Sequence, residues 1–246
     1  MIDLNGKTID VRDPLPNDFA GNDIIVVNRS ENISMKVCIT TVKFVYRLLM
    51  DDPWENLLET AKKVHLDNSK LQDFCPFPKD IKKQTLKPFH IPASDLMQNE
   101  TDLLTDDYGE LRDAFISASP YAHWRQTYKG TIIGQKFLNQ FGCYGLIGPE
   151  SPFQSEKIRA WVVYMPKQFY YPWHHHPAEE MYLCLAGEAV FRRANCPDIS
   201  LGSGGIMEHS ANQSHSMKTL EHPIMAYVVW RNEFSTKPVL TFGDAR

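Results

Sequence analysis

The pattern of apolar and polar residues changes character about halfway along the chain, and the first half predicts mostly helix. Residues 51–65 carry one apolar stripe at helical spacing, and Pro53 suits the first position of that helix. Residues 105–119 and 119–128 repeat this pattern and predict two further helices. Amphipathic stripes of this kind indicate helices that pack one face against a larger core.

Two other segments of the first half are less regular. Residues 33–48 carry apolar side chains at helical spacing, and a helix is the favoured interpretation, although their β-branched content also suits a strand. Residues 67–100 contain several prolines and many polar residues, so we expect an irregular connection there. The region up to residue 129 is therefore expected to be mostly helical.

From Gly130 onward, glycines become frequent and short runs rich in β-branched and aromatic residues recur. Such runs, separated by glycine turns, predict an all-β sandwich or barrel. The runs cover residues 136–148, 157–165, 179–193, 214–219 and 223–230. We expect a mainly β protein in which residues 130–246 form a barrel, with residues 1–129 packed on it as a helical region of one compact unit.

Composition narrows the class of protein. A chain of 246 residues with 43% hydrophobic and 23% charged residues suits a globular protein, and its net charge of -4 argues against a nucleic-acid partner. No apolar run approaches the ~20 residues that span a bilayer, and the first residues lack a secretory signal pattern. An odd number of cysteines, without the spacing of disulfide pairs, predicts reduced thiols and a cytoplasmic location. These are Cys38, Cys75, Cys143, Cys184 and Cys196.

One strand-like stretch, residues 170–187, is unusually rich in histidine and glutamate. If strand pairing resumes in phase after a turn at Pro177, alternation places His174, His176 and Glu180 on one face, together with Tyr182. Two imidazoles and a carboxylate suit zinc or another divalent transition metal with coordination positions left open. The pattern therefore predicts a metal site, with Zn, Fe, Mn, Ni and Co as candidates.

A fourth ligand is expected from a neighbouring strand, and the chain offers His209 and His215. We favour His215, because it follows a turn and opens an alternating strand, whereas His209 stands among loop-like residues. The expected ligands are then His174, His176, Glu180 and His215. The alternative is that these histidines are hydrogen-bonded core residues or part of a solvated surface loop.

The spacing H-x-H-x3-E-x6-G, from His174 to Gly187, matches the first cupin motif at every defined position. The stretch SANQSHSM stands where the second cupin motif belongs, without its usual P-x-G. Together with GLIGPESPF, SHSMKT and AYVVWR, the stretch YYPWHHHPAEEMYLCLAGEAVFR resembles the cupin-type dimethylsulfoniopropionate lyases over about residues 119–232. The resemblance implies a single cupin barrel, which is a jelly-roll-like double-stranded β-helix, carrying the metal site.

The resemblance also implies a reaction. The family cleaves its substrate by β-elimination: a proton leaves the carbon next to the carboxylate, dimethyl sulfide departs and acrylate remains. The metal would bind the carboxylate and stabilise the developing negative charge. Tyr182 is the favoured base, as a phenol whose pKa the metal lowers, and Tyr171 is next, although their roles could be exchanged. Packing at the barrel rim is the alternative role for both tyrosines.

The substrate of this family carries a dimethylsulfonium cation, which an aromatic wall would attract through the ring quadrupole. Trp230, Tyr144 and Phe141 lie on expected barrel strands and are the candidates for that wall, although each also suits a core position. Trp173 and Trp161 are weaker candidates, because the sequence does not fix which face they occupy. The implied partner is a small molecule with a carboxylate and a sulfonium, and a homodimer is the assembly considered.

Three other functions use the same residues. The chain could be a different metal cupin enzyme, such as an iron-dependent dioxygenase or an isomerase of a small carboxylate. It could be a binding or regulatory cupin without chemistry, although such modules commonly lose metal ligands and this chain keeps them. It could also be a lyase-like relative whose main substrate is another small carboxylate. Release of dimethyl sulfide by the purified protein separates these functions.

Overall fold

The computed structural model describes residues 24–29, 33–38 and 52–242. By its contacts the chain divides into two units, residues 1–55 and 56–246. In the first unit, β1 (Ile24–Arg29) and β2 (Ile33–Cys38) form an antiparallel hairpin. The helix expected over residues 33–48 is therefore wrong for 33–38, and 39–48 lies outside the described residues. β-Branched side chains favour a strand once a partner strand completes the ladder of hydrogen bonds.

Two of the predicted helices are confirmed. α2 (Pro53–Asp67) begins where Asp52 accepts a hydrogen bond from the backbone N–H of Trp54 at 2.9 Å, so the first turn is capped. α5 (Gly109–Ala118) buries the apolar stripe that predicted it. The amphipathic pattern identified both helices because each lays one apolar face on the barrel.

Two expectations for the same region are wrong. Residues 119–128 form only a short 3-10 turn, Ser119–Tyr121, followed by a two-residue strand, because the backbone beyond the turn pairs with the barrel. The connection over 67–100 is not wholly irregular. It holds α3 (Ser69–Phe74), which Asn68 caps with its side chain, and α4 (Pro92–Gln98).

The rest of the chain forms the expected barrel from two sheets. Its elements are β3 (Lys82–Lys83), β4 (Trp124–Arg125), α6 (Gln135–Gln140), β5 (Gly142–Ile147), β6 (Phe153–Gln154), β7 (Arg159–Met165), β8 (Tyr170–His175), β9 (Glu179–Gly187), β10 (Ala189–Arg193), β11 (Ile199–Leu201), β12 (Ile206–His209), β13 (His215–Lys218), β14 (Ile224–Arg231) and β15 (Val239–Leu240). One sheet has the order β11-β10-β13-β8-β15. The other has the order β12-β9-β14-β7-β5-β6-β3, and β4 pairs with β5 at its side.

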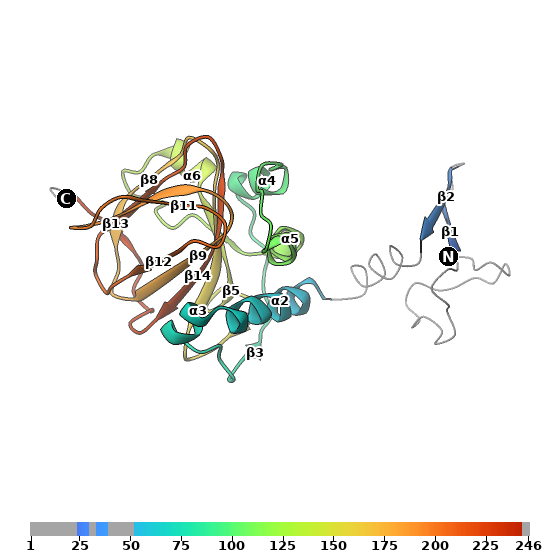
Figure 1. The fold of residues 1–246 in the computed structure, drawn as a ribbon, viewed down its shortest axis with the longest axis horizontal. Helices are drawn as coiled ribbons and strands as arrows, with labels where there is room; N and C mark the ends of the chain where they lie inside the picture. Colours follow the sequence, from blue (N-terminus) through green and yellow to red (C-terminus); the bar gives the residue numbers. More distant parts are fainter. Residues whose placement is uncertain (1–23, 30–32, 39–51, 243–246) are drawn as a thin grey trace. The chain divides into compact units, whose positions relative to one another are not determined.

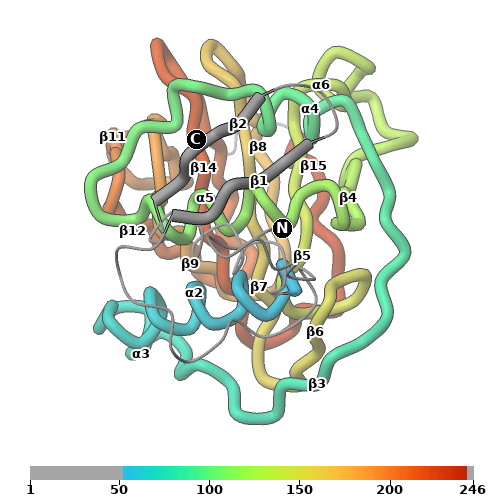
Figure 2. The backbone as a smooth tube through the Cα atoms, turned by 90° about the vertical axis from the view of Figure 1, so that its right-hand side faces the viewer, coloured from blue at the N-terminus to red at the C-terminus, as the bar shows by residue number. Residues whose placement is uncertain are grey.

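The helices cover the outer face of the larger sheet. In Figure 1, α2, α4 and α5 lie along one side of the barrel, and Figure 2 shows α2 and α5 in front of β7 and β9 when that side faces the viewer. Consequently β5 and β14 are buried along nearly their whole length, on both faces. This explains why they read as continuous apolar runs rather than as alternating ones.

The barrel interior is an apolar cluster to which both sheets contribute side chains. On β9, Tyr182 and Cys184 point inward, and their partners on β14 are Val228 and Ala226. Gly187 ends β9 with a φ of 71°, and a Cβ there would lie 1.8 Å from the carbonyl oxygen of Pro223, so the turn requires glycine. Among the described helices, none combines the length and apolar character needed to cross a bilayer.

The division at residues 129 and 130 remains a prediction. The helices α3 to α6 and the barrel all fall within the second unit, which begins at Asn56. Within that unit, β3 and β4 lie before residue 130 and pair with barrel strands, whereas the longer barrel strands begin at β5.

Candidate metal centre

Five strands from the two sheets bring the site residues together through their register. His215 on β13 is the cross-strand partner of His174 on β8, within the smaller sheet. Glu180 on β9 is the partner of His209 on β12 and of Trp230 on β14, within the larger sheet. The site therefore lies between the two sheets, so it exists only when the barrel is closed.

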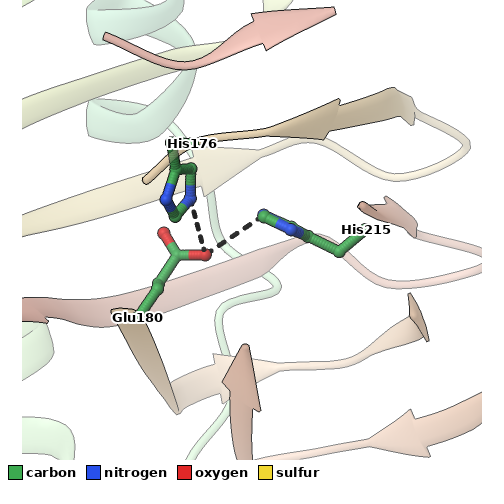
Figure 3. A group of neighbouring side chains, drawn as sticks. All are labelled: His176, Glu180 and His215. Carbon is green, nitrogen blue, oxygen red and sulfur yellow. Dashed lines mark ion pairs between the residues drawn. The ribbon is translucent and has the colours of Figure 1, made fainter. Parts of the chain in front are cut away.

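His176, Glu180 and His215 form a compact group. Their candidate ligand atoms all lie within 4.8 Å of one another (Figure 3). The carboxylate oxygen Oε2 of Glu180 lies 3.4 Å from Nε2 of His176 and 3.1 Å from Nε2 of His215. All three side chains are at most 3% exposed. A carboxylate and two imidazoles so placed offer one oxygen and two nitrogen ligands to a single ion.

The hydrogen bonds of the two histidines fix which ring nitrogen faces inward. Nδ1 of His176 lies 2.9 Å from the carbonyl oxygen of Ala178, and Nδ1 of His215 lies 2.8 Å from that of Gln213. A carbonyl accepts only, so each Nδ1 carries the proton and each Nε2 keeps a lone pair. Neither Nε2 has a hydrogen-bond partner among the described residues. This is the orientation by outer partners that metal-binding histidines show.

Two further histidines border the group. His174 stacks on Tyr171, and its ring centroid lies 4.0 Å from that of His215 and 6.4 Å from that of His176. His209 places Nδ1 2.9 Å from Oε2 of Glu180 and stacks on His215 at 3.9 Å. The structure thus places His215 in the compact group and both His174 and His209 beside it.

Burial and charge set the protonation of the cluster. Burial alone would raise the pKa of Glu180, but the surrounding histidines, His176 first, hold that pKa well below its usual range. Burial, and then His215, lower the pKa of His174 strongly and that of His209 to about 3. Glu180 is therefore ionised, and His174 and His209 are neutral, which are the forms that bind a metal.

Trp230 holds the second oxygen of the carboxylate. Its indole Nε1 donates to Oε1 of Glu180 at 2.7 Å, and its ring centroid lies 4.1 Å from that of His176. We expected this residue as part of a substrate wall, and it does line the cavity. The hydrogen bond gives it another role, which is to orient Glu180 so that Oε2 faces the histidines. The alternation pattern of β14 could not show this contact.

A cavity of about 360 Å³ leads from the surface to this group. Besides His174, His176, Glu180 and Trp230, four residues singled out in the sequence line it, namely Tyr171, Tyr182, Phe141 and Trp161. Tyr144 does not, and its expected place in the substrate wall is wrong. That side chain points to the other face of β5.

The other face of β5 explains the placement of Tyr144. Its ring packs on Trp124 and Phe115, and its hydroxyl donates to the carbonyl of Phe115 in α5. Trp173 lies on the outside of the barrel, in a separate surface hollow. Both placements follow from the pleat: neighbouring residues of a strand face opposite sides, and the larger sheet is covered on both.

Three phenols meet near the cavity floor. The hydroxyls of Tyr171 and Tyr128 are hydrogen-bonded at 2.8 Å, and Tyr182 is buried close to both. Burial is the main cause that raises the pKa of each phenol, and the charge of Glu180 raises the pKa of Tyr182 further. Tyr128 was not among the candidate site residues. It lies between β4 and α6, outside any strand, and no spacing in the sequence connects it to the motif.

An antiparallel barrel of two sheets, with histidines and a glutamate gathered inside between them, is the architecture of a cupin. The model of the dimethylsulfoniopropionate (DMSP) lyase family matches residues 71–226. The chain is 42% identical over 194 residues to the DMSP lyase DddQ of Ruegeria pomeroyi, covering 79% of this chain and 96% of that protein. The chain belongs to the DMSP lyase family.

Solved structures agree with this assignment. The crystal structure of DMSP lyase DddQ from Ruegeria pomeroyi superposes with a TM-score of 0.77 at 42% identity, covering 79% of this chain and 99% of that one. A structure from a study of the DMSP lyases RdDddP and RnDddQII superposes with a TM-score of 0.74 at 32% identity. The match covers 77% of this chain and 98% of that one. The resemblance seen in the motifs is thus confirmed over most of the chain.

Proposed function

We propose that this protein is a metal-dependent carbon–sulfur lyase that cleaves dimethylsulfoniopropionate to dimethyl sulfide and acrylate. The observation that carries this function is the buried group of His176, Glu180 and His215 at the inner end of a cavity, in a chain of the DMSP lyase family. The cavity is of the size that small-molecule sites have. Its inner end combines a carboxylate and imidazoles with phenols that can exchange a proton.

The donor set fits a divalent transition metal or zinc. We assign His176, Glu180 and His215 as ligands and His174 as the fourth, with Zn, Fe, Mn, Ni or Co as the ion. The support is chemical: the Nε2 atoms of His176 and His215 keep lone pairs, and the carboxylate beside them is ionised. When bound, such an ion supplies positive charge that stabilises negative charge developing on the substrate and lowers the pKa of a nearby phenol.

The protein's own residues then provide the proton transfer. We assign Tyr182 as the base, because its ring shares the inward face with Glu180, two residues away on β9. The phenolate takes the α-proton, the C–H electrons form the double bond, and the C–S electrons leave with dimethyl sulfide. Tyr171 is the alternative base, and Tyr128 fixes the direction of its hydroxyl through their hydrogen bond. Burial of these groups keeps water from competing for the proton.

The aromatic side chains give the sulfonium a place in the cavity. Phe141 packs on Tyr171 with a centroid separation of 4.5 Å, and Trp161 packs on Trp230 at 4.6 Å. Each pair presents ring faces or edges to the same cavity. A cation without hydrogen-bond donors is attracted by ring faces, so we assign Phe141, Trp161 and Trp230 to the sulfonium end of the substrate.

The decisive experiment is direct. Purified protein loaded with each candidate metal in turn is mixed with dimethylsulfoniopropionate, and dimethyl sulfide in the headspace and acrylate in solution are quantified. We expect equal amounts of the two products, and loss of both with a chelator or with His176→Ala. A metal-loaded, folded protein that releases neither product would contradict this function and favour a cupin acting on another small carboxylate.

We further propose a cytoplasmic location and a homodimer. Cys75, Cys143, Cys184 and Cys196 are free thiols, which suits a reducing compartment. A two-fold dimer is the commonest assembly of soluble proteins, and light scattering of the purified protein tests it. Fractionation of the source cells tests the location.

A further inference from the structure

The outer end of the cavity is bordered mainly by basic side chains. We define the cavity mouth by its charged residues, which are Arg125, Lys129, Glu150, Arg159 and Lys237. Four of the five are cations. They come from three separate segments: β4 and the residues after it, the start of β7, and the loop that follows β14. The inner ligand group plays no part in this charge, because it lies at the other, buried end.

Arg159 is the guanidinium of the mouth without a carboxylate partner among the described residues, whereas Arg125 lies close to Glu150. It is partly buried, its Nη1 donates to the carbonyl of Ile158 at 2.9 Å, and its guanidinium lies 4.1 Å above the ring of Phe234. Its Nε is buried and has no hydrogen-bond partner. Within residues 52–242, no carboxylate forms an ion pair with it. Buried charges in proteins are normally paired, so this arrangement is unusual.

The neighbouring charges increase the need for an anion. Arg125 lies close enough that its positive charge, after the larger effect of burial, lowers the pKa of Arg159. The carboxylate of the mouth, Glu150, is 3.8 Å from Nε of Arg125 and 3.6 Å from Nε2 of His123. It is therefore already shared by these two partners. Arg125 and Arg159 line the same cavity, so their two positive charges attract an anion into it.

We infer that Arg159, together with Arg125, forms an outer carboxylate subsite at the mouth of the cavity, distinct from the metal group at its inner end. The inference rests on the proposed function for the identity of the ligand, because the substrate and the product acrylate each carry one carboxylate. The subsite binds the substrate before it moves inward and holds acrylate as it leaves. It discriminates against cations that lack a carboxylate, since the mouth repels them.

A purely structural role for Arg159 is the competing explanation. Its bonds to backbone carbonyls and its contact with Phe234 could serve only to hold the segment before β7. The two explanations predict different effects of the positive charge of Arg159 on anion binding. A structural role predicts lost stability when Arg159 is replaced, whereas a carboxylate subsite predicts weaker anion binding that a lysine partly restores and that salt screens.

The test measures binding without turnover. Propionate, which has the carboxylate but no leaving group, is titrated by calorimetry into metal-loaded wild type, Arg159→Gln, Arg159→Lys and Arg125→Gln. We expect Arg159→Gln to lower the affinity for propionate on the order of ten-fold, because a charge-assisted hydrogen bond is lost at a partly exposed site. Arg159→Lys should lose less of this affinity. Arg125→Gln should also weaken binding, since it leaves Glu150 unpaired in the mouth.

The matched control is Arg193→Gln. Arg193 also has a buried, unpartnered Nε and donates to the carbonyl of Glu208, but it lies in a hollow on the outside of the barrel. Its replacement should leave propionate affinity unchanged. In wild type, raising the salt from low to physiological concentration should weaken the binding of propionate. In Arg159→Gln, the affinity for propionate should depend less on salt.

Kinetics give the second readout. For Arg159→Gln we expect KM for dimethylsulfoniopropionate and the inhibition constant of acrylate to rise by a similar factor, with kcat within about two-fold. Unchanged propionate affinity in both Arg159→Gln and Arg125→Gln would overturn the subsite. So would an Arg159→Lys variant as weak as Arg159→Gln. If wild type released no dimethyl sulfide while propionate binding still depended on Arg159, only the proposed substrate would be wrong.

Discussion

Replacing Trp230 by phenylalanine isolates one hydrogen bond of the metal centre. The change keeps an aromatic ring beside His176 and Trp161 but removes the indole N–H that donates to Oε1 of Glu180 at 2.7 Å. Trp230 is 5% exposed and Glu180 is 2% exposed, so water cannot readily replace the donor. Oε1 would then be a buried, charged oxygen without its partner.

The size of the effect follows from that geometry. A hydrogen bond to a charged group contributes about 1.5–3 kcal/mol, and each 1.4 kcal/mol is a factor of ten in affinity. Loss of an outer partner of a metal ligand typically costs ~10–100-fold in metal affinity. We expect Trp230→Phe to weaken zinc binding by about 10- to 100-fold, while the fold is kept.

The assay is competition for zinc against a chromophoric chelator, with circular dichroism to confirm the fold. Trp161→Phe is the matched control: it removes an indole from the same aromatic pair, but Trp161 lies in the cavity wall without a hydrogen bond to Glu180 among those found. That variant should bind zinc as wild type does. Zinc affinity of Trp230→Phe within about three-fold of wild type would refute the orienting role of Trp230.

Four further predictions follow from the site. His176→Ala should leave the folded protein with little bound metal by elemental analysis, and wild-type metal content would remove His176 as a ligand. Tyr182→Phe should keep metal but lose at least ~10²-fold in turnover, whereas activity within a few-fold of wild type would transfer the role of base to Tyr171. Tyr128→Phe should lower turnover several-fold in the wild-type background but not in the Tyr171→Phe background, because Tyr128 acts through the hydroxyl of Tyr171. Additive losses of turnover in the double variant would contradict this role. Metal-free protein should lose stability as the pH falls below ~6.5, because the pKa of His209 is about 3 in the folded protein and the unfolded chain then binds one more proton. Chemical denaturation at pH ~7.5 and ~5.5 should show that the free energy of unfolding depends less on pH in His209→Gln than in wild type. An equal pH dependence in the two proteins would refute this prediction.

Some of the helices and strands that the sequence predicted correctly have one dominant periodicity, whereas β5 and β14 were found as continuous β-rich runs. α2 and α5 carry one apolar stripe, and β9 alternates between the barrel interior and the covered face. Residues 33–38 failed because helical spacing and β-branched content conflict there, and pairing with another strand decided between them. Residues 119–128 failed because their backbone bonds to the barrel instead of to itself.

His176 lies in the turn between β8 and β9, which belong to different sheets, so alternation along one strand did not fix its position. For the site, the sequence alone determined the inward face of β9, and hence that Glu180 and Tyr182 would be neighbours. That much is local, because a strand has a fixed period of two. Everything that depends on which strands face one another was decided by the closed barrel: the position of His209 beside Glu180, the hydrogen bond from Trp230, and the phenol of Tyr128. These contacts join residues that are 29 to 50 positions apart, and no periodicity reaches across that distance.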